Sequence, residues 1–268
     1  MALWLVATPI GTLGDCSPRA QEVLRSSRAI AAEDTRTTRR LLGALHIDAP
    51  ELVALHAHNE DAISARLAER ARVEDIALVS DAGTPGVSDP GAVLVRAAQS
   101  LGVEIRSVPG PSALASAIAA SGIASSPIAF LGFPPRKGRE GWVRDTLSRA
   151  DTLVIYEAPG RIAELVEYFA GFAPDREACL CREISKRHEE IVRRRLPELA
   201  EDLRGRSKIL GECVLVVGPG TPLRAEVAAV DVEAGIRDVA AALAERWGCS
   251  RREVYRELLA LEERFRSE

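Results

Sequence analysis

Five turns rich in glycine and proline have the composition and spacing of a ligand-binding site in this 268-residue sequence. Each directly follows a short apolar run that predicts a β-strand, and together they cover residues 8–15, 80–89, 109–112, 157–161 and 218–222. Glycine lets the backbone approach a ligand closely, and proline fixes the course of a turn. Because open α/β sheets bind ligands at the carboxyl ends of their strands, the five turns favour one shared site.

The longest of these turns, residues 80–89, carries two aspartates with different expected roles. Asp81 stands at the tip of a predicted strand, before a flexible Ala-Gly pair, so we expect it to be a polar anchor for a ligand. Asp89 precedes Pro90, and this pair is typical of a helix N-cap followed by proline in the first turn. The sequence therefore places Asp81 in the site and Asp89 at a helix start.

Paired acids beside a basic cluster follow the second predicted strand. Glu33 and Asp34 are these acids, and Arg36 begins the cluster. A carboxylate can remove a proton and a cation can stabilise developing negative charge, so all three are candidate catalytic residues. Asp34 has the alternative role of an N-cap, which leaves Glu33 and Arg36 for substrate contact. Lys186 is a further candidate cation near the acceptor, with an ordinary surface lysine as the alternative.

Other ligand-binding motifs are missing from the sequence. It contains no G-x-G-x-x-G after the first strand, no G-x-x-x-x-G-K-[ST] and no G-x-S-x-G, which argues against NAD, P-loop nucleotides and a hydrolase elbow. The five cysteines are scattered, and Cys179 and Cys181 share one face of a predicted strand without a second pair at ligand spacing. His56 and His58 form an isolated pair. We therefore expect buried thiols, a surface histidine pair and no metal.

Alternating strands and helices must position the turns of the first half. Strands are predicted at residues 3–7, 29–32, 52–55, 76–79 and 103–108, with helices between them. This alternation predicts βαβ units, a mostly parallel sheet and the α/β fold class. Later strands are predicted at residues 152–156, 177–184 and 212–217, and Pro127–Lys137 is expected to join two domains, which occupy residues 1–110 and 111–219.

A helical tail is predicted at residues 231–268, after a linker at residues 219–230. Gly248 would form the turn of a helix-turn-helix, and Ser250 and Glu253 have the spacing of a capping box. The second helix would expose Arg251, Arg252 and Arg256. A plain helical hairpin that packs on the rest of the protein is the alternative to a nucleic-acid-binding unit.

The composition is that of an ordinary globule, with 47% hydrophobic and 28% charged residues and a net charge of −4. Basic residues nevertheless gather at residues 36–40, 136–144 and 182–195, close to the turns, and favour a phosphate-facing surface. The longest apolar runs are too short to span a bilayer, and the N-terminus has no basic region of a signal peptide. We expect no membrane association and a cytosolic protein.

Seven motifs, in this order, carry a resemblance to a known family. They are Val6-Ala-Thr-Pro-Ile-Gly11, Ala31-Ala-Glu-Asp-Thr-Arg36, Leu78-Val-Ser-Asp-Ala-Gly-Thr-Pro85, Ser88-Asp-Pro-Gly91, Pro109-Gly-Pro-Ser112, Phe130-Leu-Gly-Phe133 and Tyr156-Glu-Ala-Pro159. The sequence resembles the small-subunit ribosomal RNA cytidine 2′-O-ribose methyltransferases, a branch of the tetrapyrrole-methylase-like superfamily. The resemblance covers about residues 3–219. It departs from the family's usual residues at Thr12, Gly160 and Arg194-Arg195.

The resemblance implies two α/β domains, with a parallel N-terminal sheet and a mixed C-terminal sheet, followed by the helix-turn-helix-like tail. It implies S-adenosylmethionine in the cleft between the domains, a cytidine ribose of 16S ribosomal RNA near the decoding region as acceptor, the small ribosomal subunit as partner, and a homodimer. The residues implied to line the cofactor are Pro9, Ile10, Ser80, Asp81, Ala82, Gly83, Val87, Ser112 and Ala113 from the first domain, and Tyr156, Arg182, Gly218 and Pro219 from the second.

Two alternatives stay open on the sequence. In one, the tail binds nucleic acid and the α/β body senses a small ligand without turnover, as a regulator does. In the other, the methyl transfer is kept but the acceptor is a tetrapyrrole or a modified histidine. The basic clusters and the Ala31–Arg36 motif weigh against this second alternative.

Overall fold

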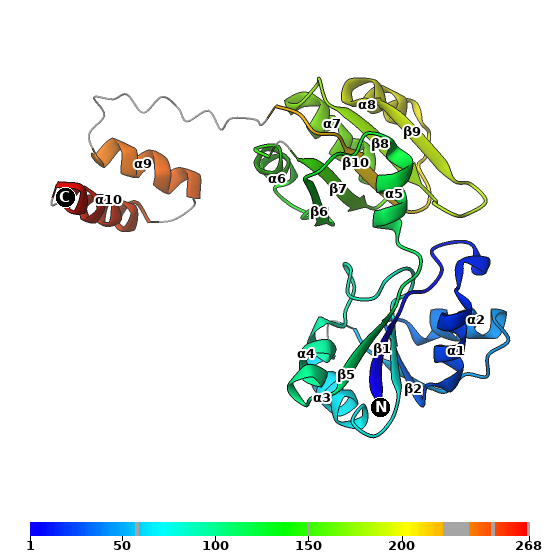
Figure 1. Cartoon of the computed structure of the whole chain (residues 1–268). Coiled ribbons are helices and arrows are strands. Elements are labelled where there is room, and N and C mark those ends of the chain that lie inside the picture. The colour runs from blue at the N-terminus through cyan, green and yellow to red at the C-terminus, as the bar shows by residue number, and fades with distance from the viewer. Residues whose placement is uncertain (57–58, 150, 222–235, 248–249, 267–268) are drawn as a thin grey trace. The chain divides into compact units, whose positions relative to one another are not determined.

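The computed structural model describes residues 1–56, 59–149, 151–221, 236–247 and 250–266. Contacts divide the chain into two compact units, Met1–Leu223 and Arg224–Glu268. The first unit contains two five-stranded sheets (Figure 1). Both sheets belong to one unit, so the division into domains at residue 110 stays a prediction.

The first sheet is wholly parallel, as the sequence predicts. Its strands have the order β3-β2-β4-β1-β5, and every pairing between neighbours is parallel. The bounds are β1 Ala2–Val6, β2 Ala29–Ala32, β3 Glu51–Ala54, β4 Ile76–Val79 and β5 Glu104–Val108. All residues of β2 and β4 are buried, because helices cover both faces of the sheet.

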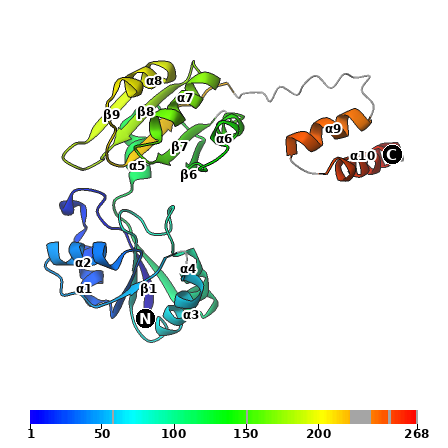
Figure 2. The same cartoon turned by 180° about the vertical axis from the view of Figure 1, so that it is seen from behind.

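Two pairs of helices cover this sheet, α1 and α2 on one face and α3 and α4 on the other (Figures 1 and 2). Alternate residues of β2 show the two faces: Ile30 packs in the core with α1 and α2, and Ala31 packs with α3 and α4. The bounds are α1 Pro18–Ser26, α2 Thr35–Ala44, α3 Glu60–Arg70 and α4 Ala92–Ser100, with a 3₁₀ turn at Leu13–Asp15. Ser17 caps α1, because its side chain accepts a hydrogen bond from the Ala20 amide.

The prediction that Asp89 caps α4 is wrong. The N-cap residue is Gly91, whose φ of 133° lies outside the range that other residues favour. A carboxylate from α3 satisfies the exposed amides instead: Glu60 Oε1 accepts hydrogen bonds from the Gly91 amide at 2.7 Å and the Val93 amide at 3.3 Å. Asp89 is therefore not needed to cap α4 and can have another role.

The second sheet is mixed, in the order β6-β7-β10-β8-β9. Strands β6 and β7 are parallel and all other pairs are antiparallel. The bounds are β6 Ile128–Gly132, β7 Thr152–Glu157, β8 Glu177–Arg182, β9 Glu190–Arg195 and β10 Cys213–Val217. The expectation that Pro127–Lys137 joins two domains is wrong, because the first part of this stretch is β6, a strand of the second sheet itself.

Helices also cover both faces of the second sheet. On one face α5, Ala113–Ser121, packs through Ala117 against Cys179, Cys181 and Val216. On the other face Phe169 of α7 lies in a larger core that α6 and α8 complete. The bounds of these helices are α6 Arg139–Thr146, α7 Ile162–Phe172 and α8 Leu196–Gly205.

The second unit is a pair of helices, α9 Ile236–Trp247 and α10 Arg251–Arg266. They have a small core of their own, formed by Ala240, Ala244 and Val254. Arg251, Arg252 and Arg256 are exposed, as the sequence predicts, whereas Gly248 lies outside the described residues. Across the part of the chain that the structure describes, no helix is long and apolar enough to cross a membrane.

Candidate ligand-binding site

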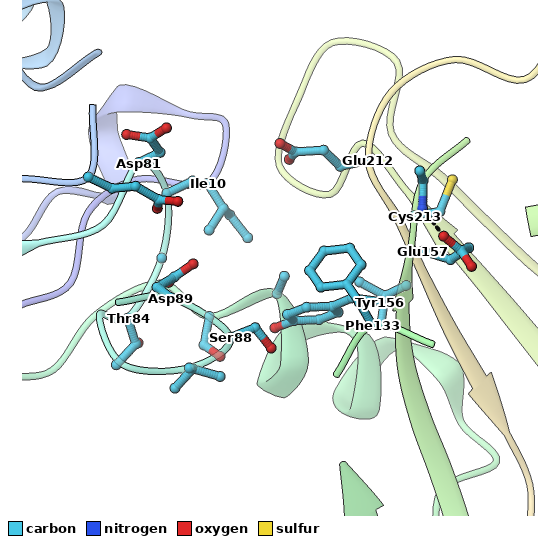
Figure 3. Close-up of a pocket in the computed structure, with 18 of the residues that line it drawn as sticks. Ile10, Asp81, Thr84, Ser88, Asp89, Phe133, Tyr156, Glu157, Glu212 and Cys213 are labelled. Carbon is cyan, nitrogen blue, oxygen red and sulfur yellow. Dashed lines mark hydrogen bonds between the residues drawn. The ribbon is translucent and has the colours of Figure 1, made fainter. Parts of the chain in front are cut away.

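A pocket of about 490 Å³ lies within the first unit, where turns of both sheets meet (Figure 3). The first sheet contributes the turns at the carboxyl ends of β1, β2, β4 and β5, and the second contributes the ends of β6 and β7 and the start of β10. Nine of the residues expected at the site line this pocket: Ile10, Glu33, Asp81, Ala82, Gly83, Val87, Ser112, Ala113 and Tyr156.

The turns after β1 and β4 are held together by backbone hydrogen bonds. The Thr8 amide donates to the Gly83 carbonyl at 2.9 Å, and the Gly83 amide donates back to the Thr8 carbonyl at 3.0 Å. Gly83 has a φ of 84°, in the left-handed region, and a Cβ there would lie 3.4 Å from the Ile10 side chain. The conformation, rather than the space, therefore requires glycine at this position.

Three carboxylates, those of Glu33, Asp81 and Asp89, lie on the wall formed by the first sheet. Burial raises the pKa of each, and the neighbouring Asp81 charge adds to the rise for Glu33. Burial, followed by the charge of Glu33, raises the pKa of Asp89 to about 6. Asp81 also fixes the adjacent turn, because its Oδ1 accepts a hydrogen bond from the Asp34 amide at 3.0 Å.

Asp34 and Arg36 are both outside the pocket lining and bind each other. Asp34 is the N-cap of α2, where its carboxylate accepts from the Arg36 amide at 2.8 Å, so the capping alternative describes its local role. The same carboxylate accepts from the Arg36 guanidinium at 2.7 and 3.1 Å. These hydrogen bonds lower the pKa of Asp34 to about 2. The Arg36 side chain is 81% exposed, so it remains accessible to a substrate.

The opposite wall carries aromatic rings, of which only Tyr156 is among the residues expected at the site. The Tyr156 ring makes edge-to-face contacts with Phe130 at 4.9 Å and with Phe133 at 5.6 Å between centroids. Phe133 lies at the end of β6 and is 57% exposed although it lines the pocket (Figure 3). The pocket thus has an acidic wall facing an aromatic wall.

A buried ion-pair network fixes the turn after β7. Glu157 accepts hydrogen bonds from Arg139 at 2.6 Å, from the Arg161 guanidinium at 2.9 Å and from the Ala158 amide at 2.7 Å. The side chains of Glu157 and Arg139 are 0% and 5% exposed. The expectation that Arg139 belongs to an exposed basic cluster is therefore wrong, since this arginine positions a turn of the pocket.

Lys186 does not line the pocket but forms an ion pair with a residue that does. Its ammonium forms ion pairs with Glu183 at 2.9 Å and with Glu212 at 3.1 Å, and Glu212 lines the pocket. The preceding residue joins this loop to the first sheet, because the Ser185 Oγ accepts from the Thr12 amide at 3.0 Å. Lys186 therefore acts on the pocket through Glu212 in this arrangement.

The remaining expected residues also lie outside the lining, which is the case for Pro9, Ser80, Arg182, Gly218 and Pro219. Ser80 is buried directly below the pocket, and its hydroxyl donates to the Ala82 and Gly83 carbonyls at 3.3 and 3.4 Å. Arg182 pairs with Glu190 at 2.8 Å. The thiols of Cys179 and Cys181 lie 3.8 Å apart in the core. No group of three or more potential metal ligands gathers anywhere among the described residues.

Several lining residues were missed from the sequence: Thr84, Ser88, Asp89, Phe133, Glu157, Ala158, Pro159, Glu212, Cys213 and Val214. Six of them belong to the turns 80–89 and 157–161 that the sequence did single out: Thr84, Ser88, Asp89, Glu157, Ala158 and Pro159. Phe133 follows Gly132 in a quoted motif, so its signal was present. Glu212 and Cys213 had none, because they lie at the start of an antiparallel strand rather than after the end of a parallel one.

Comparisons with known proteins extend over most of the chain. Residues 2–200 match the family described as tetrapyrrole (corrin/porphyrin) methylases. Ribosomal RNA small subunit methyltransferase I of Xylella fastidiosa is 46% identical over 220 residues, 80% of each chain. The protein of the same name from Hydrogenobaculum sp. is 38% identical over 230 residues, 84% of this chain and 99% of that one. Uroporphyrin-III C-methyl transferase from Thermus thermophilus, complexed with S-adenyl homocysteine, shares the fold, with a TM-score of 0.55 and 21% identity over 81% of this chain and 97% of that chain.

Proposed function

Because the chain belongs to the tetrapyrrole methylase family, in the branch named ribosomal RNA small subunit methyltransferase I, we propose that it methylates small-subunit ribosomal RNA. The methyl donor is S-adenosylmethionine. The observation that supports this most directly is the pocket, which lies at the turns that carry the family motifs. Its position at the carboxyl ends of the parallel strands is where α/β proteins bind ligands.

The pocket fits this cofactor in size and charge. Its volume of about 490 Å³ is within the range of small-molecule sites. S-adenosylmethionine carries a sulfonium and an ammonium group, and the carboxylates of Glu33 and Asp81 offer opposite charge on one wall. Ile10 and Tyr156 offer apolar surface to the adenosine part. These residues, together with the Asp81–Gly83 turn, are the ones we expect to hold the cofactor.

The residues of the pocket mainly have to orient the acceptor. S-adenosylmethionine supplies an electrophilic methyl group, so the protein gains most from aligning the acceptor oxygen with that methyl carbon. Rigid turns favour such alignment, because the Thr8–Gly83 hydrogen bonds hold one wall and the Glu157 network holds the other. A ribose hydroxyl must also lose its proton during the transfer.

Exposed cations offer a surface for the RNA backbone. Many arginines of the three basic clusters are paired with acids, such as Arg36, Arg182 and Arg193. Within the described ranges, six exposed cations of these clusters have no carboxylate within 4.0 Å: Arg39, Arg40, Arg136, Lys137, Arg187 and Arg194. Such cations bind phosphates without reading sequence, and the exposed ring of Phe133, three positions before Arg136 in the sequence, offers a base a stacking surface.

We propose that the acceptor is the 2′-hydroxyl of a cytidine near the decoding region of 16S ribosomal RNA. We further propose that the protein acts as a homodimer in the cytoplasm, on RNA assembled in the small subunit. These finer assignments rest on the family resemblance, and the exposed cations of the three basic clusters support an RNA acceptor over a tetrapyrrole.

Mass mapping of ribose methylation tests the function directly. Small subunits from cells without the protein are incubated with the purified protein and labelled S-adenosylmethionine, and the RNA is digested and mapped. We expect one methylated cytidine ribose, and binding that weakens steeply with salt. Methylation of a base nitrogen would contradict the 2′-O assignment, and preferential transfer to a tetrapyrrole would contradict an RNA acceptor. Light scattering that shows a monomer at micromolar concentration would contradict the dimer.

A further inference from the structure

Asp89 is a half-buried carboxylate of the pocket that, among the described residues, caps no helix and pairs with no cation. Glu60 performs the capping of α4 that the sequence assigned to Asp89. The other acids nearby do hold the structure together: Asp81 accepts from the Asp34 amide, Asp34 binds Arg36, and the Asp81 amide bonds to Glu33. Within the described ranges, no backbone amide donates to Asp89.

The backbone before Asp89 is held in an uncommon conformation. Ser88 has a φ of 67°, in the left-handed region that a non-glycine residue seldom adopts. Such conformations are strained and concentrate at functional sites, where the surrounding structure maintains them. This strained turn carries the Asp89 carboxylate, which lines the pocket (Figure 3).

The groups around Asp89 are acidic or neutral. Glu33 faces it from the end of β2 and Asp81 from its own turn, and both raise its pKa; the Ser80 hydroxyl lowers it. Tyr156 faces it from β7, close enough for the Asp89 charge to raise the tyrosine pKa. A carboxylate in such surroundings is a stronger base than one paired with arginine, as Asp34 is. It is also still mostly ionised at neutral pH.

We propose that Asp89 is the catalytic base, which accepts the proton of the acceptor hydroxyl during methyl transfer; this rests on the proposed function. The acceptor oxygen forms a bond to the methyl carbon as the bond between that carbon and sulfur breaks. The hydroxyl proton passes to an Asp89 carboxylate oxygen, and S-adenosylhomocysteine leaves as a neutral thioether. Asp89 then returns the proton to solvent, and no further reactant is needed.

The test is Asp89→Asn, measured in single turnovers at saturating cofactor on small subunits. We expect the rate to fall by about 10²–10⁴-fold, the usual contribution of a general base. The cofactor Kd, measured by calorimetry, is expected to stay within about threefold, because the shape of the side chain is kept. Asp89→Glu, which keeps the carboxylate, should retain part of the rate. Asp48→Asn is the matched control, since Asp48 is exposed and outside the pocket.

The pH profile of the native protein is an independent readout that needs no variant. The logarithm of the single-turnover rate should rise with a slope of one below about pH 6 and then level off. Because Asn has no proton to lose, this rise should be absent from Asp89→Asn. A structural or cofactor-binding role would not remove it.

The outcomes separate this inference from the function on which it rests. If the native protein methylates small-subunit RNA and Asp89→Asn does so within threefold of its rate, the role of Asp89 is wrong and the function stands. The same holds if the rate falls only in proportion to cofactor affinity, or if the native pH profile is flat between pH 5 and 7. If the native protein transfers no methyl group to small-subunit RNA, the function fails and the inference fails with it.

Discussion

Asp89→Asn should make the protein more stable at pH 8 and leave its stability at pH 4 unchanged. The pKa of Asp89 lies at about 6 in the folded protein, against an ordinary value of 3.8, a rise of about two units. One unit corresponds to about 1.4 kcal/mol, and because solvent screens this half-buried carboxylate, its charge costs about 1–2 kcal/mol once the group is fully ionised. The folded state binds the proton more tightly than the unfolded state. The stability of the native protein therefore falls as pH rises from about 4 to about 6.

Urea unfolding of both proteins without cofactor, at pH 4, 5, 6, 7 and 8, measures this difference. The variant has no carboxylate at this position, so the difference in unfolding free energy should grow from about zero at pH 4 to about 1–2 kcal/mol at pH 8. The melting temperature at pH 8 should rise by several degrees, given roughly 2–4 °C per kcal/mol for a domain of this size.

If Asp89 capped a helix, the unfolding measurements would give another result. Asparagine caps helices as well as aspartate does, so the substitution would change stability little at any pH. A difference below about 0.5 kcal/mol at pH 8, or one that does not vary with pH, would refute the reasoning from burial. Greater stability combined with lost turnover would indicate a strained functional site.

Three further substitutions or truncations test other parts of the structure. Arg139→Met leaves the buried Glu157 with one cation fewer, so we expect the free energy of unfolding, measured in urea, to fall by about 3 kcal/mol. Arg144→Met on the same helix is the control, and it should lower that free energy by less than about 0.5 kcal/mol because the ion pair of Arg144 is exposed. Gly91→Ala places a Cβ 2.7 Å from a buried leucine side chain, in a backbone with a φ of 133°, and should destabilise the protein by about 2 kcal/mol. Gly43→Ala, in a helix with open space around it, should stabilise the protein by about 0.5–1 kcal/mol. Ending the chain after residue 221 should weaken binding to small-subunit RNA and leave the cofactor Kd unchanged; equal RNA affinity with a lower melting temperature would indicate packing instead.

The parallel sheet could be predicted because its signals are local. Fully apolar runs such as Ala29–Ala32 and Ile76–Val79 are buried on both faces, and each precedes a turn and a helix. The two missed strands, β6 and β9, are the edges of the second sheet. Their residues are mostly half-buried or exposed, and β9 carries three consecutive arginines. Their pairing depends on distant partners, which the composition of an edge strand does not reveal.

The residues of the site could be predicted where their signals are local. Turns after parallel strands gather at one edge of a sheet, so Asp81, Gly83 and Ser112 could be placed together from their positions in the chain alone. Asp89 could not, because Asp-Pro is a strong local signal for a helix start. The competing cap comes from Glu60, on another helix and 31 positions away in the sequence. A distant carboxylate thus overrode a local preference and left Asp89 available to the pocket.

The pocket, where we expect the methyl transfer, and the tail helices belong to different units of the chain. Every residue that lines the pocket belongs to the first unit, between Ile10 and Val214, and the tail helices bury Ala240, Ala244 and Val254 against each other. The match with the Hydrogenobaculum relative covers 84% of this chain and 99% of that protein. That relative therefore has no counterpart for the remaining part of this chain. None of the described tail residues lines the pocket, and the tail's exposed arginines carry positive charge that phosphates can bind. We therefore expect the tail to contribute affinity for RNA, with the methyl transfer left to the pocket.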